Sequence, residues 1–210
     1  MSAIDTIFYL LILLMSVVIH EVAHGFMAEQ FGDDTARDAG RLTLNPIKHI
    51  DPFGSIILPA LLFFSTAATG HPFVFGWAKP VPYNPNNLSN RKWGTIAVAA
   101  AGVLANIFIA VIFGILIRLS VGYPVSDSFY FVTSTIVLVN LALAIFNLVP
   151  IPPLDGSKIL FSLLPASWYE VMDFIERYGF VLLLVFIFYF SDILYPILAY
   201  SFSLVTGLAF

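Results

Sequence analysis

Long apolar stretches alternate with short polar ones along this chain. A helix needs about 20 consecutive apolar residues to cross the hydrocarbon core of a membrane. Three stretches reach that length, at residues 7–31, 93–119 and 128–149. The pattern therefore predicts three membrane-spanning helices as the main elements of the fold.

Two other apolar stretches are less regular. Residues 178–210 are long enough to span a membrane, but Asp192 and Pro196 interrupt them, so we expect either one tilted helix or a broken pair. Residues 56–68 are shorter and contain a proline, which favours a re-entrant or interfacial segment. Residues 71–90, rich in Pro, Gly and Asn, are expected to form a short cytoplasmic strand or hairpin, or else a solvated loop.

The composition indicates an integral membrane protein. Apolar residues make up 60% of the chain and charged residues only 10%, against roughly 25% in soluble domains, and the mean hydropathy is +0.94. We therefore expect an all-α, polytopic helical bundle in the lipid bilayer, with residues 1–210 as one domain because no internal repeat is visible. A net charge of −4 argues against a nucleic-acid partner, and the lack of cysteine excludes disulfides and thiolate chemistry.

Basic residues concentrate between the first two long apolar stretches. Six of the nine Lys and Arg residues lie there: Arg37, Arg41, Lys48, Lys79, Arg91 and Lys92. Because Lys and Arg are retained on the cytoplasmic side, residues 30–92 are expected in the cytoplasm and the N-terminus outside. Residues 1–6 carry no Lys or Arg, so no secretory signal peptide is expected. The expected location is the cell membrane (inner or plasma membrane), crossed several times.

One short motif carries most of the chemistry. His20, Glu21 and His24 stand near the cytoplasmic end of the first long stretch, in the pattern His-Glu-x-x-His. Residues four apart share one face of a helix, so both imidazoles can reach the same cation. Glu21 lies beside that pair, where its carboxylate can act on a metal-bound water. The pattern is typical of zinc metalloproteases, and the alternative is a polar cluster that extends from a helix end into the lipid headgroups.

A catalytic zinc ion usually has three protein ligands, so a third ligand is needed. Asp155 is the preferred candidate, because the three prolines within residues 150–153 must unwind the chain just before it. In the alternative interpretation, Asp155 caps the helix that follows it. His49 and His71 are the remaining candidates, but His49 lies in a stretch that reads as interfacial and His71 precedes a proline in a loop.

The expected topology places these groups on the same side of the membrane. His20 and His24 lie toward the cytoplasmic end of the first span, and Asp155 follows a span that also ends inside. The active site is therefore expected toward the cytoplasm. This agreement requires that residues 56–68 do not cross the membrane.

With these motifs the chain resembles the site-2 protease family of intramembrane zinc metalloproteases, peptidase family M50. The similarity runs from the first span to residue 164 and rests on several ordered motifs. These motifs lie at residues 20–25, 45–54, 76–82, 102–106 and 147–156. The chain is most similar to the compact bacterial and archaeal branch, which has no PDZ or CBS domain.

The resemblance implies a three-helix catalytic core that holds one zinc ion. The implied zinc ligands are His20, His24 and Asp155. Glu21 would be the catalytic base, and Asn147 would position the substrate or stabilise the oxyanion. Asn106 has a role near the substrate path in the family, whereas its run of small neighbours favours close helix packing. Many relatives carry a second glycine after Asp-Gly, where this chain has Ser157.

The implied activity is hydrolysis of peptide bonds in or near the transmembrane segments of other membrane proteins, as in regulated intramembrane proteolysis. The alternative is a divalent-metal transporter or another metal-binding membrane protein, because His, Asp and Glu within a membrane also mark ion pathways. Transporters usually contain repeated half-structures, and none is visible here. An inactive scaffold is disfavoured because the ligands and the base are all present. Asp192 is left without a role.

Overall fold

The computed structural model of the chain describes residues 3–67 and 76–210, which form helices and irregular segments without a strand. Three of these helices are long and apolar enough to span a membrane. They are α1 (Ala3–Gln30), α4 (Arg91–Ser120) and α5 (Asp127–Asn147). All three correspond to the predicted spans, and each boundary lies within four residues of its expected position.

Local chemistry explains where two of these helices begin and where one ends. The Asn90 side chain accepts a hydrogen bond from the Trp93 backbone N–H at the start of α4. Ser126 accepts one from the Phe129 N–H at the start of α5. Such N-caps satisfy amides that have no partner within the helix. α5 ends at Asn147 because the prolines that follow cannot continue it.

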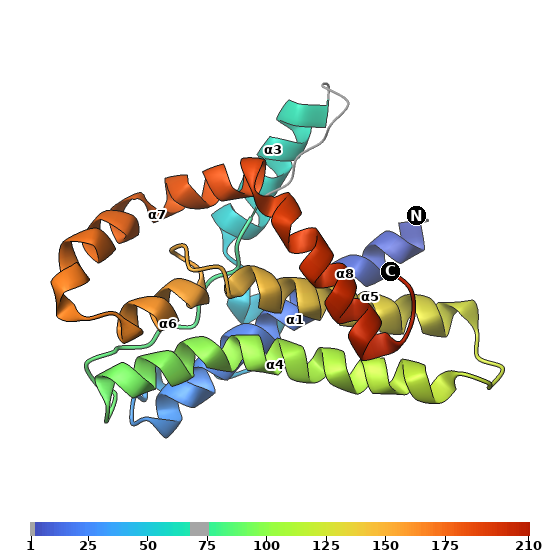
Figure 1. Cartoon of the computed structure of the whole chain (residues 1–210), viewed down its shortest axis with the longest axis horizontal. Helices are drawn as coiled ribbons and strands as arrows, with labels where there is room; N and C mark the ends of the chain where they lie inside the picture. The colour runs from blue at the N-terminus through green and yellow to red at the C-terminus, as the bar shows by residue number, and fades with distance from the viewer. Residues whose placement is uncertain (1–2, 68–75) are drawn as a thin grey trace.

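α4 packs against both α1 and α5 (Figure 1). Small residues line its buried side and let the neighbouring backbones approach closely. They include Gly94, Ala99, Ala101, Gly102, Ala110 and Gly114. Beyond them, a cluster of apolar side chains fills the space between α4, α5 and the C-terminal helix. It consists of Ala110, Ile117, Val137, Leu141 and Phe202.

Short elements connect α1 to α4. They are α2 (Thr35–Asp38), η1 (Pro46–His49), the π-helical turn η2 (Pro52–Ile57) and α3 (Leu58–Ala67). η2 continues into α3 without a break, and this helical run ends at Ala67, the last residue of the first described range. Whether residues 56–68 form a re-entrant or interfacial segment stays a prediction.

The expected cytoplasmic strand lies partly outside the described residues, which include neither His71 nor its neighbours 68–75. The described part from Gly76 onward is irregular and forms no hairpin with the rest of the described chain. Its backbone instead bonds to the segment around η1 and η2. The Trp77 N–H donates to the Gly54 carbonyl, and the Lys79 N–H donates to the His49 carbonyl.

The C-terminal part continues with α6 (Asp155–Leu163), η3 (Ala166–Trp168), α7 (Tyr169–Tyr189), η4 (Ser191–Ile193) and α8 (Leu194–Thr206). α7 and α8 meet at an angle of 65°, so the last apolar stretch is a broken pair and not one tilted helix. Pro196 favours this break, because a proline clashes with the carbonyl four residues before it in a continuous helix. The end of α8 is joined to the end of α4 by Arg118, which donates to the carbonyls of Leu204 and Val205.

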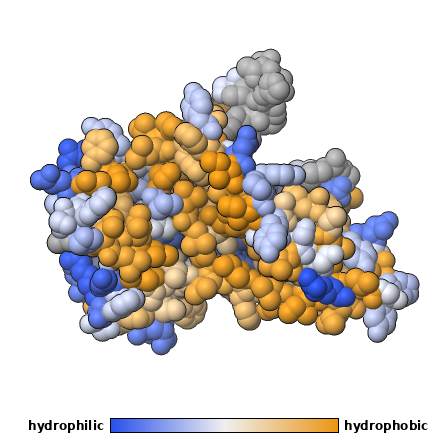
Figure 2. Space-filling model, viewed as in Figure 1, coloured by the Kyte–Doolittle hydropathy of each residue, from blue (hydrophilic) through white to orange (hydrophobic). Residues whose placement is uncertain are grey.

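The surface agrees with a location in a membrane. Figure 2 shows that apolar side chains dominate the middle of one face, while hydrophilic ones gather at the end where α4 begins and around the connection from α4 to α5. Large apolar side chains on the outside of α4 are exposed, among them Leu104, Phe108 and Leu119. Such a belt would be unfavourable in water and is favourable in lipid.

Candidate metal centre

Three side-chain atoms meet at one point between α1 and the start of α6. His20 and His24 lie one turn apart on α1, and their Nε2 atoms are 3.1 Å from each other. One carboxylate oxygen of Asp155, Oδ2, lies 3.1 Å from each of these nitrogens. All three residues are buried, with exposed fractions of 4–7%. The three atoms therefore form a small, nearly equilateral triangle that is shielded from solvent.

The other nitrogen of each imidazole decides what the three atoms can bind. The His24 Nδ1 lies 2.7 Å from the Val98 carbonyl, which only accepts hydrogen bonds, so Nδ1 carries the proton. The His20 Nδ1 lies 2.6 Å from the Asn106 side-chain oxygen and carries the proton for the same reason. In the neutral imidazoles each Nε2 then presents a lone pair. The buried Asp155 Oδ2 accepts no hydrogen bond from the described residues.

Three lone-pair donors this close together repel one another unless a cation lies among them. Tetrahedral zinc, with bonds of about 2.0–2.1 Å to nitrogen and oxygen, places neighbouring ligand atoms about 3.3 Å apart. The observed separations of 3.1 Å are close to that value. Two imidazoles and one carboxylate also make up a common ligand set of catalytic zinc. The residues present therefore fit a zinc ion.

A buried amide network holds the His20 ring. Asn106 on α4 donates to the Asn140 side-chain oxygen on α5, at 2.8 Å. Asn140 in turn donates to the Ser16 hydroxyl on α1, at 2.9 Å. This chain of hydrogen bonds links all three spanning helices and fixes which way the Asn106 oxygen faces. Hydrogen bonds of this kind orient metal ligands and set which nitrogen is free.

Gly102 provides the space for both imidazoles. A β-carbon at this position would lie 2.6 Å from Cε1 of His20 and 2.6 Å from Cε1 of His24. No other residue type can therefore occupy this position without moving the rings. Gly102 and Asn106 are one turn apart on α4, so this helix both makes room for the histidines and orients one of them.

Glu21 faces the same site and is held by the backbone of the irregular segment. Its ligand atom and those of His20 and His24 all lie within 4.8 Å of one another. The Val81 N–H donates to Glu21 Oε2 at 2.9 Å. Arg41, which is buried, donates to the carbonyl of Lys79 at 2.7 Å and so holds the segment just before Val81. The carboxylate therefore has a defined direction beside the two imidazoles.

A second buried charge holds the far end of the same segment. Asp33 is fully buried and accepts hydrogen bonds from the Asn84 N–H at 2.6 Å and the Asn87 side chain at 2.8 Å. Burial raises the pKa of the Asp33 carboxyl, but hydrogen bonds from Thr35, Asn84 and Asn87 lower it more, so its pKa lies below the usual value. Residues 79–84 are thus a fixed wall of the site.

The three atoms open into a cavity of about 530 Å³. The cavity is lined by the irregular segment, including Ala78 and Tyr83, and by Asn147 and Lys158. Lys158 lies 3.1 Å from the other carboxylate oxygen of Asp155, Oδ1. This contact leaves Oδ2 to face the imidazoles.

The M50 family model matches residues 8–137 and 124–187, which include the histidine motif and the segment around Asp155. The chain belongs to peptidase family M50. It is 39% identical over 187 residues to "Putative zinc metalloprotease YwhC" of Bacillus subtilis (strain 168), an alignment that covers 84% of this chain and 78% of that protein. No solved structure matches the chain significantly.

Two mycobacterial relatives are less similar. "Putative zinc metalloprotease Rip2" of Mycolicibacterium smegmatis is 30% identical, and the alignment covers 82% of this chain and 63% of that protein. The protein of the same name from Mycobacterium tuberculosis (strain H37Rv) is 28% identical, with the same two coverages. This chain therefore spans less than two thirds of these relatives. Family membership and the three apolar helices identify the chain as a membrane zinc metallopeptidase.

The M50 fold brings most of the sequence-predicted residues together. Asp155 is the first residue of α6 and not its N-cap, which is Leu154. The Asn147 amide donates to the Leu143 carbonyl one turn earlier, but the side chain still lines the cavity. His49 is buried outside this cluster, with Nε2 bonded to the Thr43 carbonyl. His71 lies outside the described residues.

Three residues of the M50 site were not predicted from the sequence. Gly102 was named only as part of the motif at residues 102–106, with no contact to the histidines expected, and Asn140 and Lys158 received no role in the site. A signal did exist for two of them. Gly102 and Asn106 share a helix face because they are four apart, and Lys158 is three residues from Asp155 on the next turn. Asn140 had no such signal, because its partners lie on other helices.

Proposed function

We propose that the chain is an intramembrane zinc protease that hydrolyses peptide bonds in or near the transmembrane segments of other membrane proteins. The observation that carries this proposal is the buried triangle of His20, His24 and Asp155, in which both imidazoles project from one membrane-length helix, α1, and pack against another, α4. A site at this position meets membrane substrates without their leaving the bilayer.

In this proposal His20, His24 and Asp155 hold the zinc ion through Nε2, Nε2 and Oδ2. A zinc ion held by these residues would lower the pKa of a bound water and polarise a peptide carbonyl. Glu21 takes the proton from the attacking water and later delivers it to the leaving amine. The hydrogen bond from the Val81 N–H to Oε2 supports this role, because it holds the carboxylate in place beside the two imidazoles.

The two asparagines act differently in this proposal. Asn147 lines the cavity and can donate to the substrate carbonyl or to the oxyanion once its bond to the helix backbone is exchanged. Asn106 acts through His20, because its side-chain oxygen bonds the ring and its nitrogen is occupied by Asn140. It is a positioning residue and does not touch the substrate.

A substrate helix must unwind before its carbonyls can be attacked, and the segment from Gly76 to Tyr83 offers a template for the unwound chain. The amides of Trp77 and Lys79 bond to the neighbouring backbone on one side. Backbone groups alternate along an extended chain, so those of Ala78 face the other side, toward the cavity that Ala78 lines. An unwound substrate can pair there as an added strand. Ala78→Pro, which deletes one N–H, would then slow cleavage while zinc binding persists; unchanged cleavage would exclude the pairing.

The proposal includes a topology. The single domain crosses the cell membrane several times, with its N-terminus outside and the metal centre toward the cytoplasm. Residues 56–68 form a re-entrant or interfacial segment. The partners are membrane-protein substrates and the bilayer itself. Cysteine-accessibility labelling of intact cells, with single cysteines placed at Asp5 and at Asn86, tests this orientation: only the first should react from outside.

The decisive experiment compares the purified wild type with Glu21→Gln. We expect the variant to retain one zinc ion per chain and to lose cleavage of a transmembrane peptide by at least about 100-fold. Glu29→Gln, which removes an acid further along the same helix, is the matched control and should retain both zinc and cleavage. Cleavage by Glu21→Gln at the wild-type rate would refute the role of Glu21. Full zinc affinity in Asp155→Ala would refute the ligand set.

A further inference from the structure

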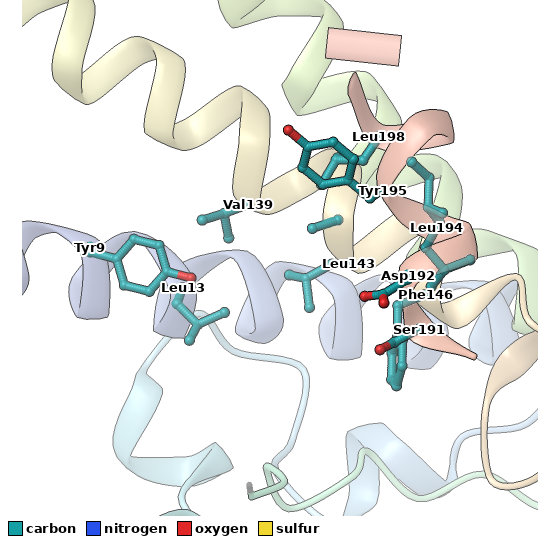
Figure 3. A pocket seen from close by; sticks show the side chains of 12 residues that line it. Tyr9, Leu13, Val139, Leu143, Phe146, Ser191, Asp192, Leu194, Tyr195 and Leu198 are labelled. Atoms are coloured by element: carbon teal, nitrogen blue, oxygen red, sulfur yellow. The ribbon is translucent and has the colours of Figure 1, made fainter. Parts of the chain in front are cut away.

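A second cavity of about 460 Å³ lies outside the metal centre, between α1, α5 and the break that joins α7 to α8. Figure 3 shows Tyr9 on α1 and Asp192 at the break on opposite sides, with Val139 and Leu143 of α5 between them. Most of its lining is apolar. We call this cavity the lateral groove.

The lateral groove adjoins the metal centre. Phe146, near the end of α5, lines both the groove and the cavity that contains the metal centre. Phe146 is therefore a shared wall, and a segment that lies in the groove lies next to the cavity of the metal centre. The groove also lies along the membrane-spanning helices α1 and α5, so its occupant comes from the bilayer.

Asp192 is the exceptional residue of the lateral groove. Its carboxylate forms no ion pair or hydrogen bond with residues 3–67 and 76–210, and the side chain is exposed. It does not cap α8, whose N-cap is Ile193 without a side-chain bond. Figure 3 shows the carboxylate on the groove side of the break. An acid among apolar side chains thus lacks the partner that would offset its desolvation.

The position of Asp192 makes this lack of a partner costly. The carbonyl of Leu204, twelve residues further on, is bonded to Arg118 at the end of α4. At 1.5 Å per residue, Asp192 lies up to about 18 Å from that end of the bundle. This depth falls within a hydrocarbon core about 30 Å thick. Ionisable residues at such depths are rare and usually pair with a charge of opposite sign.

We propose that the lateral groove binds the transmembrane segment of the substrate and that Asp192 selects segments with a Lys or Arg side chain. The apolar lining fits the apolar part of such a segment, and the basic group supplies the partner that Asp192 lacks. A lipid acyl chain fits the lining but offers nothing to a carboxylate. The inference rests on the proposed proteolytic function and adds a determinant of substrate choice to it.

Cleavage tests this selection directly. The substrates are transmembrane peptides with a Leu-rich sequence around an Ala-Gly-Ser centre, identical except that one position in turn carries Leu, Gln or Lys. When the variable residue stands at one or two adjacent positions of the peptide, we expect the kcat/KM of the wild type to be about 10-fold higher for the Lys peptide than for the Leu peptide, mainly through a lower KM. Asp192→Leu should abolish this preference, and Asp192→Asn should retain a preference for Gln only. Asp127→Leu, which removes an exposed acid outside the groove, should behave as the wild type.

Photo-cross-linking separates this inference from the proposed function. A photoreactive residue replaces Tyr195 in the inactive Glu21→Gln background, and the same peptides are added in liposomes. We expect the Lys peptide to be captured more strongly than the Leu peptide, and Asp192→Leu to equalise them. Equal capture throughout, or capture of lipid alone, would overturn the inference whether or not the wild type cleaves. The expected capture without any cleavage by the wild type would instead count against the proteolytic function.

Discussion

Replacing Gly102 by alanine adds one methyl group to α4 at the point where this helix faces both histidines. The new carbon would lie 2.6 Å from Cε1 of each ring and 2.7 Å from Nδ1 of His20. An ordinary contact begins at 3.4 Å, so the rings or the helix must shift by roughly 0.8 Å. Zinc sites tolerate about ±0.2 Å in their ligand distances. We therefore expect Gly102→Ala to weaken zinc binding by about 10- to 100-fold.

The stability of the fold should respond differently from zinc affinity. Alanine favours a helix over glycine by about 1 kcal/mol, which offsets part of the cost of the clash. The assay is a competitive zinc titration together with the thermal unfolding of the metal-free protein in detergent. Gly94→Ala on the same helix is the matched control, because its new carbon would lie no closer than 3.1 Å to its neighbours. If Gly102→Ala binds zinc with wild-type affinity, the packing of α4 on the imidazoles is not what positions them.

Three further predictions concern groups around the metal centre. Asn106→Ala removes the acceptor of the His20 Nδ1 proton, so zinc affinity should fall about 10-fold or more in the same titration, with Asn106→Asp recovering part of the loss. Lys158→Met removes the contact that holds the Asp155 carboxylate, so this variant should bind zinc about 10-fold more weakly. Lys158→Arg should bind zinc with wild-type affinity. The visible spectrum of the cobalt-substituted protein is an independent measurement and should be shifted in Lys158→Met. Asp33→Asn should lower the free energy of unfolding by about 2 kcal/mol at pH 7. The pKa of Asp33 is lower in the folded protein than in the unfolded chain, where it is about 3.9. The ionised carboxylate therefore stabilises the fold above the unfolded-state pKa, and this stabilisation is lost as the pH falls through the folded-state pKa. The Tm values of variant and wild type should thus converge in acid.

Patterns of neighbouring residues were enough to locate the three spans and the two histidines of the metal centre. The three membrane helices follow from the number of consecutive apolar residues, because the thickness of the hydrocarbon core sets that number. His20 and His24 share a helix face because they are four residues apart. The end of α5 follows from its prolines. None of these inferences requires knowledge of what any helix packs against.

Tertiary packing decided the rest. Asp155 meets the imidazoles only because α5 returns beside α1 and its unwound end delivers the carboxylate there. Gly102 shares a helix face with Asn106, but it makes room for the imidazoles only because α4 packs against α1. The bond between Val81 and Glu21 likewise joins residues far apart in the chain. Periodicity is a property of neighbouring residues, so the sequence alone determined the helices and the metal-binding face, and its prolines favoured Asp155 as the third ligand. The approach of that carboxylate to the imidazoles, the ring orientations and the direction of the base depend on contacts that exist only once the helices have packed.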